Sequence, residues 1–229
     1  MRLSVVVPVL NEAENIGPLA REIHASLLRH RPFEILFVDD GSTDGTAAAV
    51  RAAREQGLAE IRLLQHPERR GQSAAVFTGV RAARAEWVVT LDGDGQNDPA
   101  DIPALLDAIA AAEPTAVRLA VGHRTARRDG WLRRISSRIA NGVRGRMLRD
   151  GTPDAGCGIK VMHRETFLTL PRFDHMHRFL PALFQRAGAQ VISVPVGHRP
   201  RTRGHSKYGE RNRLWVGIVD LLGAMRLVR

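Results

Sequence analysis

The chain is poor in cysteine, lysine and long apolar runs. Cys157 is the single cysteine among 229 residues, so no disulfide can form within the chain, and a reducing compartment suits it. Lys160 and Lys207 are the only lysines, although 34 basic residues outnumber 24 acidic ones. No apolar run reaches the roughly 18 to 20 residues that span a bilayer, and Met1 leads almost directly into a predicted strand. We therefore expect neither a membrane-spanning helix nor a secretory leader.

Common signatures of nucleotide and nucleic-acid binding are also missing. A Rossmann dehydrogenase has a glycine-rich loop after its first strand, but residues 8–12 read PVLNE here. A Walker lysine loop is absent as well. The net charge of +10 would suit a nucleic-acid-binding protein, yet no helix-turn-helix, zinc or aromatic RNA-binding signature accompanies it. Nucleic-acid binding is therefore a remote alternative, and we expect no nucleic-acid partner.

Short apolar runs alternate with helical periodicity, which predicts an α/β fold with a mostly parallel sheet flanked by helices. The predicted strands are 3–9, 33–38, 61–65, 87–91, 117–122, 158–163 and 191–196. The predicted helices are 12–28, 44–56, 73–84, 99–112, 131–149, 179–186 and 213–228. Because no linker interrupts the pattern, we expect one domain over 1–210, followed by an apolar, amphipathic or juxtamembrane-type helix over 211–229.

Acidic residues follow three of the predicted strands. Asp92 and Asp94 come directly after the run 87–91, Asp39 and Asp40 end the second strand, and Glu12 follows the first. Because the carboxyl ends of parallel strands meet at one edge of a sheet, we expect these side chains to converge there. Two hard oxygen donors suit Mg²⁺ or Mn²⁺, whose remaining ligands are usually waters and phosphate oxygens. The pattern therefore predicts metal-assisted chemistry on a phosphorylated substrate.

Arginines concentrate in residues 118–149, which hold ten arginines and one acid, Asp129. Such a segment favours an anionic partner, either a nucleotide, a lipid phosphate, an anionic membrane or a nucleic acid. A solvated basic face is an equally good interpretation of the same composition.

Seven segments together resemble a known family. Residues 7–12 (VPVLNE), 38–46 (VDDGSTDGT) and 91–96 (LDGDGQ) resemble glycosyltransferase family 2, the inverting enzymes of the GT-A fold. Residues 122–124, the arginine-rich stretch with Ser137, 154–160 (DAGCGIK) and 201–207 (RTRGHSK) resemble the dolichyl- and polyprenyl-phosphate sugar synthases of that family. The resemblance covers nearly the whole chain. It implies transfer of a sugar from a nucleotide-diphosphate sugar to a polyprenyl phosphate.

The resemblance also implies a role for individual positions. It assigns donor binding to Pro8, Leu10, Glu12, Val38, Asp40, Asp92, Gly93, Asp94, Gln96, Arg201 and Lys207. It assigns binding of the metal, Mg²⁺ or Mn²⁺, to Asp94 and Gln96. It assigns binding of the acceptor phosphate to Arg124, Arg133 and Ser137. The catalytic set is Asp92, Asp94, Arg124 and Asp154. Leu10 departs from the tyrosine that is common in the family at this position.

Several neighbouring residues have more than one interpretation. Cys157 suits packing better than a nucleophilic role. Lys160 could lie near the donor or at the surface. His175 and His177 could contact the acceptor or sugar, but a packed or solvated pair is the better interpretation.

The expected lipid acceptor implies a membrane surface as a partner. The basic segment 127–149 and the apolar segment 214–228 would allow peripheral attachment, so we expect a cytoplasmic protein on the inner face of the cell membrane. The last helix could instead bind another protein or form a homo-oligomer. A family 2 enzyme with a soluble or polysaccharide acceptor is the alternative. GDP-mannose, UDP-glucose and UDP-linked uronic or amino sugars all remain open as donors.

Overall fold

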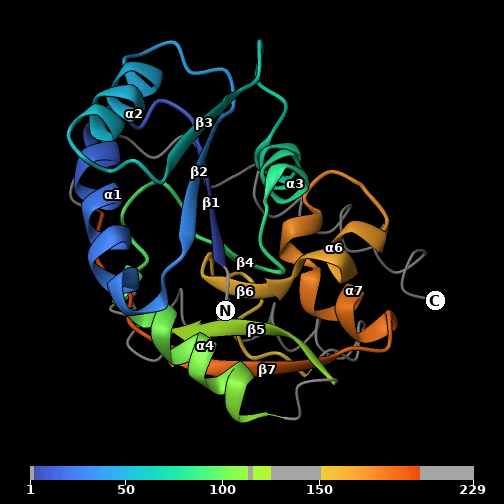
Figure 1. The fold of residues 1–229 in the computed structure, drawn as a ribbon. Helices are drawn as coiled ribbons and strands as arrows, with labels where there is room; N and C mark the ends of the chain where they lie inside the picture. Colours follow the sequence, from blue (N-terminus) through green and yellow to red (C-terminus); the bar gives the residue numbers. More distant parts are fainter. Residues whose placement is uncertain (1–2, 113–115, 125–150, 202–229) are drawn as a thin grey trace.

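The computed structural model describes residues 3–112, 116–124 and 151–201, and in these ranges one sheet runs through the molecule (Figure 1). Its seven strands lie in the order β3-β2-β1-β4-β6-β5-β7. The strands are β1 (Leu3–Val9), β2 (Phe33–Asp39), β3 (Ile61–Gln65), β4 (Trp87–Thr90), β5 (Val117–Arg124), β6 (Lys160–His163) and β7 (Gln190–Val196). Only β6 runs antiparallel to its neighbours β4 and β5 among these pairings, which confirms the predicted mostly parallel sheet.

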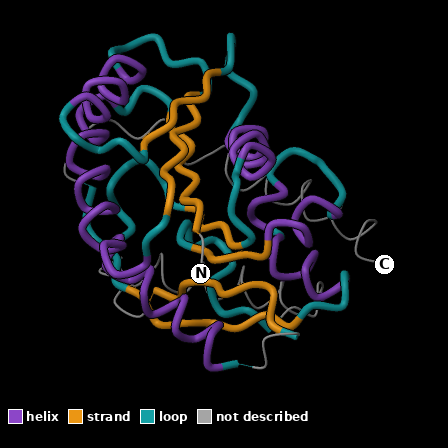
Figure 2. The backbone as a smooth tube through the Cα atoms, viewed as in Figure 1, coloured by secondary structure: helices purple, strands orange, loops and turns teal. Residues whose placement is uncertain are grey.

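Helices cover both faces of the sheet (Figures 1 and 2). The α-helices are α1 (Ala13–Leu27), α2 (Thr46–Glu55), α3 (Gln72–Ala82), α4 (Ile102–Ala111), α6 (Arg164–Thr169) and α7 (Leu180–Arg186). The 3₁₀ turns are η1 (Leu28–His30), η2 (Pro99–Asp101) and η3 (Met176–Arg178). Helices α1, α2 and α4 pack on one face, and α3, α6 and α7 on the other, so the sheet separates two apolar clusters.

The sequence of β1 explains its central place. Almost all of its side chains are buried, including Val5, Val6 and Val7, because helices cover both of its faces. In α1 the apolar positions predicted from spacing, among them Ile16 and Ile23, are buried on the sheet side.

The register aligns the carboxyl ends of the central strands. Val9 of β1 pairs with Asp39 of β2, and the Asp40 amide continues this ladder by donating to the Val9 carbonyl oxygen at 2.9 Å. The loops that follow β1, β2 and β4 therefore leave the sheet at one edge, as predicted.

The predicted strands and helices in the described ranges are confirmed, with differences of a few residues at their ends. The predicted helix 99–112 begins as the 3₁₀ turn η2 before α4, and the six-residue helix α6 was not predicted. The predicted helices 131–149 and 213–228, and with them the segment 211–229, lie outside the described residues. Within the described ranges, no helix has both the length and the apolarity to cross a membrane.

Candidate active site

The loops after β1 and β2 are held together by their own polar groups. Asn11 has a positive φ of 48°, and its side-chain oxygen accepts from the Thr43 amide at 2.8 Å. The Asn11 amide in turn donates to Ser42 Oγ at 2.8 Å. The Glu12 amide donates to Thr46 Oγ1 at 2.8 Å. These bonds fix the backbone that presents the Glu12 carboxylate.

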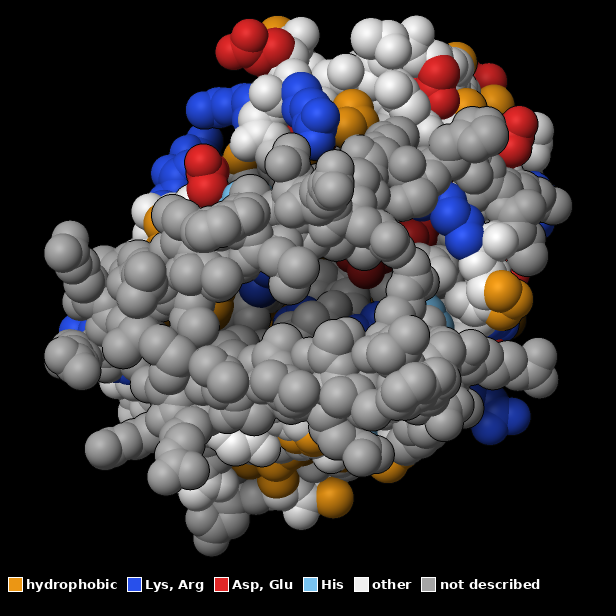
Figure 3. Space-filling view, turned by 180° about the vertical axis from the view of Figure 1, so that it is seen from behind, with side chains coloured by type: hydrophobic (Ala, Val, Ile, Leu, Met, Phe, Trp, Pro, Cys, Tyr) orange, Lys and Arg blue, Asp and Glu red, His pale blue; other side chains and the backbone are white. Residues whose placement is uncertain are grey.

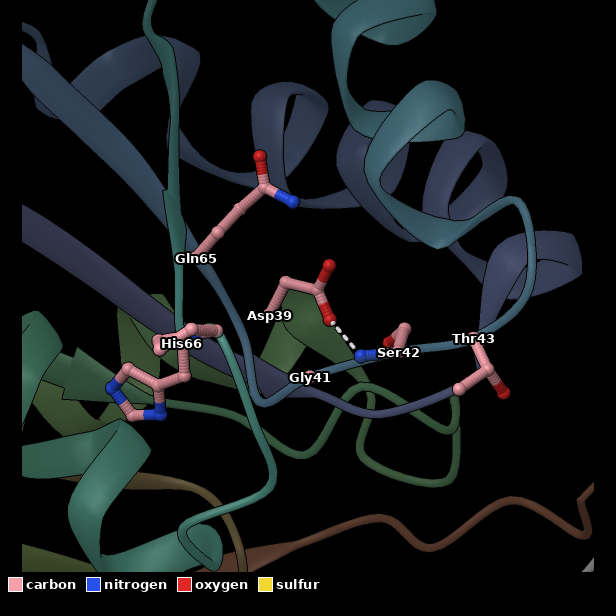
Figure 4. A pocket seen from close by; sticks show the side chains of 7 residues that line it. Asp39, Gly41, Ser42, Thr43, Gln65 and His66 are labelled. Carbon is pink, nitrogen blue, oxygen red and sulfur yellow. Dashed lines mark hydrogen bonds between the residues drawn. The ribbon is translucent and has the colours of Figure 1, made fainter.

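Asp39 and Asp40 point in different directions. Asp39 Oδ1 accepts from the Ser42 amide at 2.9 Å, beside a hollow of about 520 Å³ (Figure 4). The hollow is lined by Asp39, Gly41, Ser42, Thr43, Gln65, His66 and Pro67. Asp40 is buried, and its two oxygens accept from the amides of Arg70 and Gly71 at 2.9 and 2.8 Å.

The Asp40 carboxylate also contacts His66, whose Nδ1 lies 2.8 Å from Oδ1. Asp40 therefore shapes the loop that leads into α3, a role that sequence reasoning did not predict. Gly41 is required beside it, because a β-carbon there would lie 2.6 Å from the Arg69 nitrogen.

The loop after β4 carries the acidic pair. Asp92 Oδ1 accepts from Gln72 Nε2 at 2.9 Å, and Asp94 Oδ1 accepts from the Gln96 amide at 3.1 Å. Desolvation by the surrounding protein, together with the charge of Asp94, raises the pKa of Asp92. Since two neighbouring carboxylates repel each other, a cation between them would be stabilised.

The turn before β6 packs directly against Asp92. A β-carbon on Gly158 would lie 2.1 Å from Asp92 Oδ2 and 2.5 Å from Asn97 Oδ1. The Gly158 carbonyl also accepts from Thr90 Oγ1 at 3.1 Å. Only glycine leaves room for the carboxylate here, and Gly158 and Asn97 were not predicted as site residues.

The segment after β7 is fastened to the same edge of the sheet. The Arg199 amide donates to the Gln96 carbonyl oxygen at 2.9 Å, and the Arg199 guanidinium binds Asp98 at 2.6 Å and Glu22 at 2.7 Å. Arg201 follows, and its Nη2 donates to Glu12 Oε1 at 2.6 Å.

Arg201 also approaches the acidic pair, since its Nη1 lies 3.8 Å from Asp94 Oδ2. The structure thus brings together Glu12, Asp94 and Arg201, three positions that the resemblance assigned to the donor, although they come from three distant parts of the sequence.

Arg124, the last residue of β5, forms a two-pronged ion pair with Asp154. Its Nε and Nη2 donate to the two carboxylate oxygens at 2.7 and 2.9 Å. Asp154 is buried, whereas the Arg124 side chain is one-fifth exposed. Although burial alone would lower it, the bond with Asp154 raises the pKa of Arg124. The pair leaves a guanidinium that is fixed in place and still accessible.

Lys160 begins β6, and its ammonium group is buried rather than at the surface. Its Nζ donates to the Cys157 carbonyl oxygen, and burial lowers its pKa, partly opposed by Cys157, Asp92 and Asp154. Cys157 is fully buried, as the packing interpretation predicts, and burial raises the pKa of its thiol.

His177 approaches Lys160 from η3. Its Nδ1 lies 2.7 Å from Ser73 Oγ, and desolvation, followed by the charge of Lys160, holds its pKa well below 6.5. This histidine is therefore neutral near pH 7. Seen from behind, acidic and basic side chains lie together in a hollow of the surface (Figure 3).

The other predicted positions differ in what they offer a ligand. Pro8 and Val38 pair with each other at the ends of β1 and β2, but the Val38 side chain is wholly buried in the core. Leu10 is partly exposed. Gly93 packs against β1, because a β-carbon there would lie 2.6 Å from Val9 Cγ1. Arg133, Ser137 and Lys207 lie outside the described residues.

The acidic loop could hold a divalent ion only with help from a substrate. In the part of the chain that the structure describes, no three His, Cys, Asp or Glu side chains cluster as a metal site. Mg²⁺, however, usually binds one or two carboxylates together with waters and substrate phosphates. Asp94, its repelling neighbour Asp92 and the side-chain oxygen of Gln96 fit that chemistry.

Solved structures share this fold. Mannosyl-3-phosphoglycerate synthase from Rubrobacter xylanophilus superposes with a TM-score of 0.76 at 19% identity, covering 98% of this chain and 73% of that one. Glucosyl-3-phosphoglycerate synthase from Mycobacterium tuberculosis, in complex with Mg²⁺ and uridine diphosphate, gives 0.73 at 20% identity, covering 97% and 79%. The sheet and its flanking helices are therefore those of the GT-A fold.

Two relatives are more similar to the chain in sequence than these solved structures are. The chain is 37% identical to dodecaprenyl-phosphate galacturonate synthase of Rhizobium johnstonii, over its whole length and 68% of the relative. It is 31% identical to undecaprenyl-phosphate 4-deoxy-4-formamido-L-arabinose transferase of Edwardsiella ictaluri, over 90% of the chain and 63% of that relative. The chain thus spans slightly more than two thirds of the first relative and slightly less than two thirds of the second. Because residues 4–170 also match the pattern of Glycosyl transferase family 2, the chain belongs to that glycosyltransferase family.

Proposed function

We propose that this chain transfers a sugar from a nucleotide-diphosphate sugar to a polyprenyl phosphate, with inversion at the anomeric carbon. One observation carries the proposal. Asp92, the first acid of the pair Asp92–Asp94, lies near enough to the Arg124 guanidinium for their charges to interact, so the proposed donor site adjoins a site for a second phosphate. The names of both sequence relatives, which specify a polyprenyl phosphate, support this acceptor.

The donor half consists of Glu12, Asp94 and Arg201. Mg²⁺ or Mn²⁺, held by Asp94 and Gln96, would neutralise the diphosphate of the leaving nucleotide. Arg201 binds Glu12 at 2.6 Å, which holds its guanidinium beside the acidic loop, and a guanidinium suits the oxygens of a phosphate. Lys207, which lies outside the described residues, stays a predicted second cation for these phosphates.

The acceptor half centres on Arg124. Asp154 holds its guanidinium through two bonds, so little conformational entropy is lost when a phosphate binds. A guanidinium suits this task because its planar fork matches two phosphate oxygens. Arg133 and Ser137 stay predicted partners of the same phosphate.

The reaction needs no strong general base. An oxygen of the acceptor phosphate, ionised near neutral pH because the second pKa of a phosphate monoester is about 6, attacks the anomeric carbon. A new carbon–oxygen bond forms while the bond from that carbon to the nucleoside diphosphate breaks, and the diphosphate leaves with the electron pair. Arg201 would stabilise the growing charge on this leaving group. Attack from the face opposite the leaving group inverts the configuration.

The acceptor places the enzyme at a membrane surface, where we propose that it binds peripherally on the cytoplasmic face. For the sugar, the relatives' names offer an acid, galacturonate, and a formamido sugar, 4-deoxy-4-formamido-L-arabinose. The nucleotide, UDP or GDP, is left open by both names.

A solvent-extraction assay tests the proposal. The protein, a radiolabelled nucleotide sugar and Mn²⁺ or Mg²⁺ are mixed with undecaprenyl phosphate, with undecaprenol or with a soluble oligosaccharide. We expect label in the lipid phase with undecaprenyl phosphate alone. Label on undecaprenol to the same extent, or on the oligosaccharide only, would favour a family 2 enzyme with a different acceptor.

A further inference from the structure

Lys160 is a buried cation that has no role in the reaction proposed above. The residue is 4% exposed, and within the described ranges its Nζ has one hydrogen-bond partner, the Cys157 carbonyl oxygen. No carboxylate oxygen of the described residues lies within 4.0 Å of it as an ion-pair partner. An ammonium group has three N–H donors, so two of them remain available.

The nearby acids are engaged elsewhere. Asp154 is bound through both oxygens by Arg124, at 2.7 and 2.9 Å. Asp92 accepts a hydrogen bond from Gln72 and is repelled by the neighbouring charge of Asp94. A buried charge is unfavourable unless it is paired and hydrogen-bonded. Among the residues that the structure describes, Lys160 therefore has no ion-pair partner that would explain why it is buried.

The sheet places Lys160 beside the end of β4, the strand that leads into the loop of Asp92 and Asp94. It pairs with Thr90 across β4 and β6, two residues before Asp92. The turn that supplies its carbonyl partner includes Gly158, which packs against the Asp92 carboxylate. His177, which is near enough to Lys160 for the lysine charge to lower its pKa, is neutral and supplies no negative charge.

The choice of lysine is itself informative. Lys160 is one of two lysines in a chain with 34 basic residues, so arginine is the ordinary cation here. A compact ammonium fits a narrow buried place and pairs with a small anionic group as a point charge.

We propose that Lys160 recognises a carboxylate on the donor sugar, so that the substrate class is a nucleotide-linked uronic acid rather than a neutral or formamido sugar. This inference rests on the proposed function and narrows its donor. A sugar carboxylate would occupy the free N–H donors of Lys160. In a neutral sugar, a hydroxymethyl group or a hydrogen takes the place of the carboxylate. Such a donor would leave the buried ammonium group without an anionic partner. A site built for a polar group discriminates strongly against an analogue that lacks it.

Two donors that differ in one group provide the test. UDP-galacturonate and UDP-galactose are compared with undecaprenyl phosphate as acceptor, using the wild-type protein and Lys160→Met. We expect wild-type kcat/KM to favour UDP-galacturonate by roughly 100-fold or more. In Lys160→Met this preference should fall by about the same factor, with the activity on UDP-galactose retained and the KM for undecaprenyl phosphate unchanged.

Three results would overturn the inference. One is equal use of both donors by the wild-type protein. Another is a Lys160→Met variant that loses both activities in proportion, which indicates a structural role. The third is a rise in the KM for undecaprenyl phosphate with both donors, which assigns Lys160 to the acceptor. Should Lys160→Met fail to fold by circular dichroism, Lys160→Gln and the wild-type comparison test the same preference.

GDP-mannose, UDP-glucose and a formamido-arabinose donor separate this inference from the proposed function. Transfer from one of these donors, but not from UDP-galacturonate, would refute the uronate inference and leave polyprenyl phosphate glycosylation standing. Absence of transfer from every donor to undecaprenyl phosphate would refute the proposed function itself.

Discussion

A β-carbon on Gly158 would lie 2.1 Å from Oδ2 of Asp92, a distance at which two atoms cannot remain. The position of the Asp92 carboxylate therefore depends on a glycine that lies 66 residues further along the chain. Both groups belong to loops at adjacent strands, β4 and β6, which pair antiparallel.

Gly158→Ala should reduce glycosyl transfer by about 100-fold, because Asp92 or its loop must move by an ångström or more. Gly156→Ala is the matched control, since its new β-carbon would have no atom nearer than 3.8 Å. Initial rates of both variants, with thermal melts to verify folding, check this. Similar rates for the two variants would show that the place of Asp92 does not limit turnover.

Arg124→Ala should destabilise the fold by about 3 kcal/mol, because it removes the two-pronged ion pair that Arg124 forms with the buried Asp154 carboxylate. The double variant Arg124→Ala/Asp154→Ala should recover at least about 1 kcal/mol of that loss. Urea unfolding of the wild type, both single variants and the double variant measures the coupling. Strictly additive losses would mean that the two side chains stabilise the fold independently.

Asp92→Asn should make the protein more stable and less active. Burial and the neighbouring Asp94 raise the pKa of Asp92, so its ionised form is unfavourable in the folded state. Stability from this group is fully present below its unfolded pKa and is lost as the pH rises through the folded pKa. An amide removes that penalty at pH 7 and can still accept from Gln72.

The measurement for Asp92→Asn combines a melting temperature with a transfer rate at pH 7. We expect a higher melting temperature and a rate lower by about 100-fold. A variant that melts below the wild type would indicate that the Asp92 charge, through Lys160 and Arg124, stabilises the fold.

His177 should contribute a loss of stability in mild acid. Its folded pKa is held well below 6.5 by burial and Lys160, so below pH 6.5 the unfolded chain binds the proton more readily. Stability then falls as the pH decreases from about 6.5, and this group adds no pH dependence above that range. His177→Gln removes the titration but keeps a hydrogen-bonding group for Ser73.

Urea unfolding at pH 7.5 and pH 5.5 tests the role of His177. The wild type should lose more stability between the two values than His177→Gln does. Equal losses would show that His177 is protonated as easily in the folded protein as in the unfolded chain.

Most of the fold follows from local patterns in the sequence. The strands β1 to β5 and the helices between them were predicted because each has an uninterrupted apolar run or a clear helical stripe. Helix α6 was not predicted, since six residues carry too little periodicity to be recognised. The insertion of β6 between β4 and β5 depends on long-range pairing that no local pattern contains.

The candidate site divides in the same way. Asp92, Asp94 and Glu12 were predicted because acids at strand ends converge in a parallel sheet. Gln72 and Asn97 were not, because their roles arise only when α3 and the turn before β6 pack against Asp92. The burial of Lys160 was equally hidden, since a lone lysine at the start of a short strand is compatible with the surface.

The most direct measurement identifies both products of one turnover. Undecaprenyl phosphate, a nucleotide sugar, Mn²⁺ and the wild-type protein are incubated, with Asp94→Asn as control, and products are analysed by mass spectrometry. We expect one nucleoside diphosphate for each lipid-linked monophosphate sugar, and much less of both with Asp94→Asn. Release of a nucleoside monophosphate with a lipid diphosphate sugar, or diphosphate release without any lipid product, would contradict glycosyl transfer to the lipid phosphate.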